Sequence, residues 1–174
     1  MKHVAENRPA SRVHPRATPG RESALQDLIA GQAAAYAVVG GFDPVDRIGI
    51  VKAGLPAQLL ATLASDMQVP RERLYAWLGI ARTTANRKVK DKDLLSQDES
   101  ERALGITRLV GQVQTIVSES GNPEGFDAAR WTAQWLDQPN DALGGRPPGE
   151  FMDTADGRAL VSGLVAQMQS GAYA

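Results

Sequence analysis

The sequence predicts an all-α protein of about seven helices. Apolar residues recur three or four positions apart in most segments, which is the spacing that one face of a helix requires. Glycine, proline and capping residues separate these segments at intervals typical of helix ends. No run of alternating β-branched and aromatic residues is bounded by hairpin turns, so no strands are expected.

The composition indicates a globular protein and excludes several kinds of site. The 174 residues, 43% of them hydrophobic, suffice for one domain or two small ones. There is no cysteine, which excludes disulfides and thiolate catalysis and suits a reducing cytoplasm. The two histidines are His3 and His14, near the N-terminus, so we expect no histidine-based active site, metal or cofactor in the folded part. No segment approaches the roughly 20 apolar residues that span a bilayer, so no membrane association is expected.

Residues 1–22 are expected to form a disordered basic tail. The segment has five basic and two acidic residues, several prolines and no apolar periodicity. Such a segment buries too little apolar surface to offset the entropy lost on ordering. Two roles are open for it: a solvated tail, or an arm that contacts phosphate groups.

Four helices and one short segment are expected between Ser23 and residue 95. Ser23 is a plausible N-cap, Gly40 and Gly41 end the first segment, and Pro56 and Pro70 occupy first-turn positions. The expected helices are residues 23–39, 56–67, 70–78 and 81–90, and the short segment, residues 44–51, is expected to form one or two helical turns.

Three further helices are expected after residue 95, over residues 96–120, 126–137 and 154–171. Ser96 followed by Glu99 is a capping box, which marks the start of the first of them. Trp131 and Trp135, four residues apart, are expected in the core rather than facing a partner, as are Leu164 and Met168. Residues 138–150 form an irregular loop rich in glycine and proline.

The stretch from Leu78 to Lys88 has the pattern of a helix-turn-helix. Gly79 suits the tight turn, and Ile80 suits the apolar plug between the two helices. Residues 79–92 contain five bases and one acid, whereas residues 93–174 contain 12 acids and five bases. A basic helix can neutralise phosphates and lie in a major groove, although a solvated helix that binds nothing is the alternative. The candidate DNA-binding residues are Arg82, Thr83, Asn86, Arg87, Lys88 and Lys90.

The C-terminal stretch NDALGGRPPGEFMDTADGRALVSGLV begins at Asn140. Together with LGIARTTANRK and LSQDESERAL, it closely resembles the Xre-type antitoxins of RES–Xre toxin–antitoxin pairs, which share their C-terminal region with the MbcA and ParS antitoxins. The resemblance covers about residues 45–174. It implies a helical Xre-like helix-turn-helix domain over residues 23–95 and a small helical toxin-binding domain over residues 96–174.

The same resemblance implies that the chain is not an enzyme but a cytoplasmic antitoxin. It implies that the antitoxin forms a homodimer within a heteromeric complex and blocks the active site of a RES-domain toxin that degrades NAD. It also implies that the antitoxin represses its own operon by binding operator DNA. A chain end can enter a cleft shaped for a small substrate, because it has no second flank to clash. The candidate toxin-binding residues are Asn140, Leu143, Gly144, Gly145 and Arg146 in the loop and Gly171, Ala172, Tyr173 and Ala174 at the end.

Two other functions compete with this one. The main alternative is a helix-turn-helix transcriptional regulator without a toxin partner. An enzyme would need a carboxylate pair such as Asp153 and Asp156 or Glu99 and Glu101, but these positions are typical of helix caps and first-turn acids. The dimer interface is expected on residues 23–39 or on residues 97–119, and the sequence does not choose between them.

Overall fold

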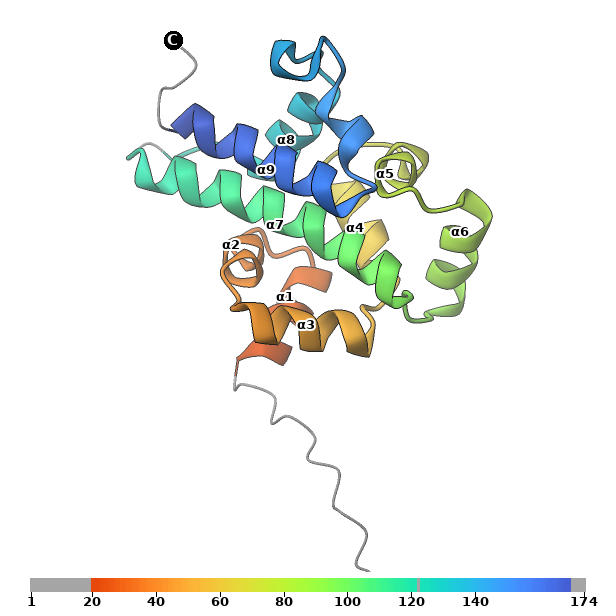
Figure 1. Ribbon diagram of the computed structural model, residues 1–174. Coiled ribbons are helices and arrows are strands. Elements are labelled where there is room, and N and C mark those ends of the chain that lie inside the picture. The colour runs from red at the N-terminus through yellow and green to blue at the C-terminus, as the bar shows by residue number, and fades with distance from the viewer. Residues whose placement is uncertain (1–19, 122, 170–174) are drawn as a thin grey trace, which may run out of the picture.

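The computed structural model describes residues 20–121 and 123–169 (Figure 1). Over these residues the protein has nine α-helices, two short 3₁₀ helices and no strand, so the all-α prediction is confirmed. The two histidines and most of the expected basic tail lie outside the described residues. The α-helices are α1 (Arg21–Ile29), α2 (Ala35–Gly40), α3 (Pro44–Ala53), α4 (Gln58–Asp66), α5 (Arg71–Leu78), α6 (Arg82–Asp91), α7 (Gln97–Glu119), α8 (Ala128–Leu136) and α9 (Ala155–Gln169).

The first expected helix, residues 23–39, is in fact two helices. Gly31 has a φ of 78°, a left-handed conformation that ends α1 and lets the chain turn back into α2. The expected N-cap, Ser23, lies inside α1, whose N-cap is Gly20. The break brings α2 against α7, where a Cβ on Gly111 would overlap the carbonyl group of Tyr36. Glycine at residue 111 therefore permits the close approach of these two helices.

The helix α7 is the central element of the fold. It packs against α2 and α3 on one side and against α8 and α9 on the other, and Figure 1 shows it running between α2–α3 and α9. Its buried side chains belong to one continuous apolar cluster that extends from Ala24 to Val165. The expected capping box at its start is confirmed: Ser96 Oγ accepts a hydrogen bond from the Glu99 backbone N–H, and Glu99 accepts one from the Ser96 N–H.

The predicted core is confirmed in most positions and wrong at Met168. Leu164 is buried, but Met168, in the last turn of α9, is 37% exposed and lines an open apolar pocket with Val117 and Trp131. Trp131 and Trp135 are half-buried and pack against the apolar cluster, with their rings stacked 6.0 Å apart. Across the described part of the chain, no helix is long and apolar enough to cross a membrane.

Candidate functional sites

The expected turn of the helix-turn-helix lies between α5 and α6. Gly79 has a φ of 58°, the left-handed conformation that glycine adopts without a steric cost. Ile80 follows with only 7% of its surface exposed, and its backbone N–H donates to the Tyr75 carbonyl. Ala85, on the inner face of α6, is fully buried. These contacts fix α6 against α5, and the predicted turn at Gly79 is confirmed.

The outer face of α6 carries most of the candidate DNA-binding residues. Arg82, Thr83, Asn86, Arg87 and Lys90 are all exposed. Arg82 pairs with Glu72 at 3.3 Å, and Arg87 pairs with Asp91 and Asp93 at 3.7 and 3.5 Å. Ion pairs between exposed side chains contribute at most about 1 kcal/mol, so both guanidinium groups can exchange these partners for phosphates at little cost.

Asn86 and Lys88 make contacts with the protein itself. The Asn86 side-chain oxygen accepts a hydrogen bond from the Tyr75 hydroxyl. The Lys88 ammonium lies 2.6 Å from the Glu99 carboxylate, and both side chains are largely buried, with 14% and 11% of their surfaces exposed. The Lys88 side chain therefore points toward α7 and not toward the outer face of α6.

The first turns of α7 also hold the helix-turn-helix in place. Arg102 donates from its guanidinium to the carbonyl oxygens of Leu78 and Gly79, at 3.0 and 3.1 Å. A cation is favourable there because the C-terminus of α5 carries partial negative charge. Sequence reasoning missed this contact. Its only local signal is an arginine in an otherwise acidic helix start, which does not identify the partner.

The glycine loop, residues 140–146, follows α8 and is closed by hydrogen bonds within its own backbone. The Asn140 N–H donates to the Arg146 carbonyl, and the Gly145 N–H donates to the Asn140 carbonyl. The Asn140 side chain accepts from the Ala142 N–H, as expected for a residue that bonds to neighbouring backbone. Gly144 and Gly145 have φ values of 65° and 79°, which side chains rarely adopt. The loop is thus a defined structure whose tip is exposed, with Leu143 half-buried at its base.

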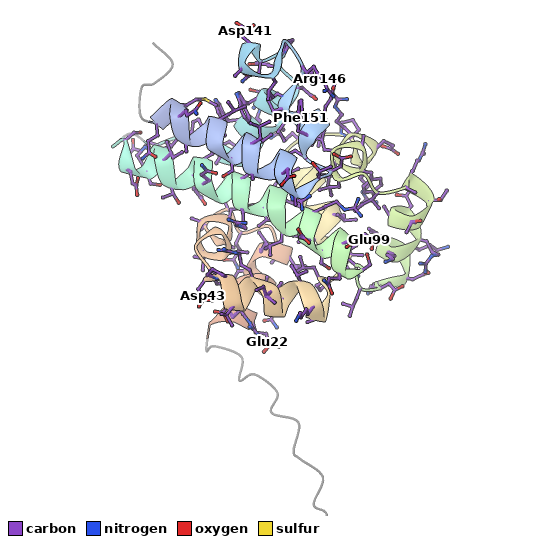
Figure 2. The ribbon with its side chains drawn as sticks, in the orientation of Figure 1. Glu22, Asp43, Glu99, Asp141, Arg146 and Phe151 are labelled. Atoms are coloured by element: carbon purple, nitrogen blue, oxygen red, sulfur yellow. The ribbon has the colours of Figure 1, made fainter. Side chains whose placement is uncertain are left out.

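The exit of this loop is anchored on the body of the protein. Arg146 pairs with Glu150 at 2.8 Å, and its guanidinium lies 4.5 Å above the ring of Phe151. In Figure 2, Arg146 and Phe151 lie between the body and the projecting tip that carries Asp141. A Cβ on Gly149 would overlap the indole of Trp77. The remaining candidate toxin-binding residues, Gly171, Ala172, Tyr173 and Ala174, lie outside the described residues.

These two features, the exposed α6 and the anchored loop, fall in two separate matches to known families. A family model described as the antitoxin Xre-like helix-turn-helix domain matches residues 46–108. A second, described as the antitoxin Xre/MbcA/ParS C-terminal toxin-binding domain, matches residues 124–171. Among curated proteins, the chain is similar to the Prs ADP-ribosylating antitoxin of Sphingobium sp. (strain YBL2). The two are 42% identical over 140 residues, which cover 80% of this chain and 88% of the relative.

Proposed function

This chain belongs to the Xre-type antitoxins, and from that membership we propose that it neutralises a RES-domain toxin that consumes NAD. We further propose that it blocks the toxin's active site, acts as a homodimer in the cytoplasm and represses its own operon. The observation that carries the proposal is the antitoxin relative, which matches most of both chains at 42% identity.

The toxin surface that we propose includes the glycine loop and the C-terminal end. The loop residues Asn140 to Arg146 lie within the match to the toxin-binding domain, and their backbone hydrogen bonds hold the exposed tip in one conformation. A tip that is already ordered loses little conformational entropy when a partner covers it. Residues 93–174 carry a clear excess of acidic groups, which would speed association with a basic cleft.

The blocking step is assigned to residues 171–174. They continue the chain beyond α9, whose last described residue is Gln169. Tyr173 offers a large, rigid contact that loses little entropy on binding. The name of the relative refers to ADP-ribosylation, and transfer of ADP-ribose consumes NAD.

Operon repression is assigned to the outer face of α6. Its exposed side chains are Arg82, Thr83, Asn86, Arg87 and Lys90, a set able to contact both phosphates and base edges. A homodimer would present two such helices to two half-sites of an operator, the usual arrangement for helix-turn-helix proteins. Lys88 is left out of this surface, because it is paired with Glu99.

Co-expression with the product of the neighbouring gene, which we expect to be a RES-domain toxin, tests the toxin assignment. We expect the full chain to co-purify with that protein and to restore both growth and cellular NAD. A chain that lacks residues 171–174 should still co-purify, because the loop remains, but should protect poorly. Full protection by the shortened chain would contradict the blocking step, and failure of the full chain to bind would contradict the function itself.

A gel-shift titration against the chain's own promoter tests repression. Arg87→Ala and Lys90→Ala should each weaken DNA binding. They should also make the plot of log association constant against log salt concentration less steep, by about 0.9 for every phosphate that is no longer neutralised. Lys52→Ala, an exposed lysine on α3, is the matched control and should leave both unchanged. Absence of binding by the intact protein at low salt would refute the proposed repression.

A further inference from the structure

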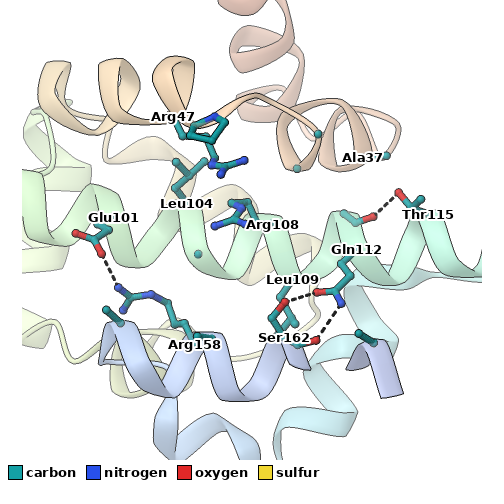
Figure 3. Close-up of a pocket in the computed structure, with 18 of the residues that line it drawn as sticks. Ala37, Arg47, Glu101, Leu104, Arg108, Leu109, Gln112, Thr115, Arg158 and Ser162 are labelled. Atoms are coloured by element: carbon teal, nitrogen blue, oxygen red, sulfur yellow. Dashed lines mark hydrogen bonds and ion pairs between the residues drawn. The ribbon is translucent and has the colours of Figure 1, made fainter. Parts of the chain in front are cut away.

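A broad groove follows α7 on the face between α2–α3 and α9 (Figure 3). Its volume is about 1130 Å³, its floor is α7, and its walls come from α2 and α3 on one side and from α9 on the other. The groove is therefore built from both parts of the chain that match known families, and no local sequence pattern identifies it.

Two arginines face each other on one side of this groove. Arg47 of α3 and Arg108 of α7 both point into the space between their helices in Figure 3. Arg47 donates to the carbonyl of Phe42, whereas the Arg108 guanidinium has no hydrogen-bond or ion-pair partner among the described residues. Partial burial, and next the positive charge of Arg47, lower the pKa of Arg108 below its usual value. Two adjacent cations that share no anion favour the binding of an anion between them.

The positive charge on the opposite side of the groove is balanced. Arg158 of α9 pairs with Glu101 of α7 at 2.9 Å, and Gln112 exchanges hydrogen bonds with Ser162. The polar groups that join α7 to α9 are thus satisfied by one another. The attraction for an anion is therefore concentrated on the α3 side of the groove, at Arg47, Arg108 and the exposed Lys52.

The rest of the groove favours a protein segment over a free ion or a nucleic acid. Ile48 is 53% exposed on the α3 wall, and the α9 wall is made largely of small residues such as Ala159 and Ala166. Gly163 adds open space, since a Cβ there would meet no atom within 4 Å. Apolar and small walls of this kind can receive the apolar face of an amphipathic helix. A phosphate backbone would instead require polar walls.

We propose that this groove binds an acidic, amphipathic helical segment of the toxin, with a carboxylate seated between Arg47 and Arg108. The α9 wall lies within residues 124–171, the match to the toxin-binding domain, so the groove continues that surface onto α3 and α7. Arginine pairs with carboxylates through parallel hydrogen bonds, and it is among the residues that dominate interface energetics. The inference rests on the proposed function, and it extends the toxin interface into the helix-turn-helix half.

Calorimetric titration tests the proposal. It measures the affinity of the purified toxin for the full chain and for its variants. Arg108→Glu and Arg47→Glu should each weaken binding by about 30-fold or more, and Arg108→Lys by less, because lysine keeps the charge but loses the paired hydrogen bonds. Ala159→Trp should weaken binding by filling the groove. The matched control is Arg71→Glu, a charge reversal at an exposed arginine of α5, which should bind within about twofold of the unchanged chain.

The outcomes separate this inference from the proposed function. Circular dichroism and retained promoter binding establish that each variant is folded. If both charge-reversal variants and Ala159→Trp bind the toxin with the affinity of the unchanged chain, the proposed role of the groove is refuted, while the antitoxin function is not. No binding by the wild-type chain would refute both. Loss of a homodimer on Arg108→Glu, with toxin affinity unchanged, would assign the groove to a second copy of this chain and overturn the proposal.

Discussion

Lys88 of α6 and Glu99 of α7 form an ion pair at 2.6 Å that joins the exposed basic helix to the central helix. The same Glu99 carboxylate completes the capping box by accepting from the Ser96 N–H. One buried carboxylate thus fixes both the start of α7 and the position of α6.

Removal of either partner should destabilise the protein unequally. Lys88→Met leaves a buried carboxylate with only the Ser96 N–H as donor, which should lower the free energy of unfolding by about 1–3 kcal/mol. Glu99→Gln keeps the capping geometry and should cost less. The double variant should lose less than the sum of the two single losses, which urea unfolding of all four proteins measures. Simple additivity would mean that the ion pair contributes no coupling energy.

The pair also predicts a loss of stability in acid. Burial raises the pKa of Glu99, but hydrogen bonds from Lys88 and Ser96 and the Lys88 charge outweigh it and leave the pKa below its usual value. A carboxyl group with a lowered folded-state pKa stabilises fully above its unfolded pKa, about 4.3, and this contribution is lost as pH falls through the folded pKa. Melting temperatures from pH 6 to pH 3 should therefore fall less steeply for Glu99→Gln than for the unchanged chain. Parallel curves would contradict this assignment.

Removal of the hydrogen bond between Tyr36 and Asp66 should cost more stability at neutral pH than in acid. The Tyr36 hydroxyl donates to Asp66 at 2.8 Å. Burial raises the pKa of Asp66, the Tyr36 hydrogen bond lowers it, and the charge of Asp127 raises it. Tyr36→Phe removes the lowering contribution, so the carboxylate becomes costlier as pH rises. We expect a loss of about 1.5–3 kcal/mol at pH 7 and a smaller loss near pH 4, because a lower pH increases the protonated fraction of Asp66.

Tyr75→Phe is the matched control for that measurement. Tyr75 is equally buried, but its hydroxyl donates to the side-chain oxygen of Asn86, which does not titrate. Its loss on substitution should therefore be similar at both pH values. A pH-independent loss for Tyr36→Phe as well would show that Asp66 does not govern the effect.

Local signals in the sequence predicted much of the fold. The capping box at Ser96 and the turn at Gly79 are encoded within a few residues, so they could be identified without the structure. The break at Gly31 could not, because an isolated glycine in an alanine-rich segment is compatible with a continuous helix. The exposure of Met168 depends on how the last turn of α9 packs against α7 and α8, which no local pattern specifies.

The functional surfaces divide in the same way. The basic face of α6 and the glycine loop are continuous in sequence, and sequence reasoning proposed both. The groove is not continuous, because Arg47 and Arg108 are about sixty residues apart and meet only when α3 packs on α7. Lys88 illustrates the limit within a single helix: its residue type matches a phosphate contact, but the fold turns it toward Glu99.

Two glycines of α9 offer a matched test of how tightly this helix is seated on the loop before it. A Cβ at Gly157 would overlap the Phe151 carbonyl and lie 2.7 Å from the Thr154 hydroxyl, whereas a Cβ at Gly163 would meet no atom within 4 Å. Gly157→Ala should therefore lower the free energy of unfolding by about 1–3 kcal/mol, since backbone atoms must move to accommodate the methyl group. Gly163→Ala should raise it by up to about 1 kcal/mol through helix propensity alone. Equal stabilities of the two variants in urea unfolding would mean that the start of α9 is not held against Phe151.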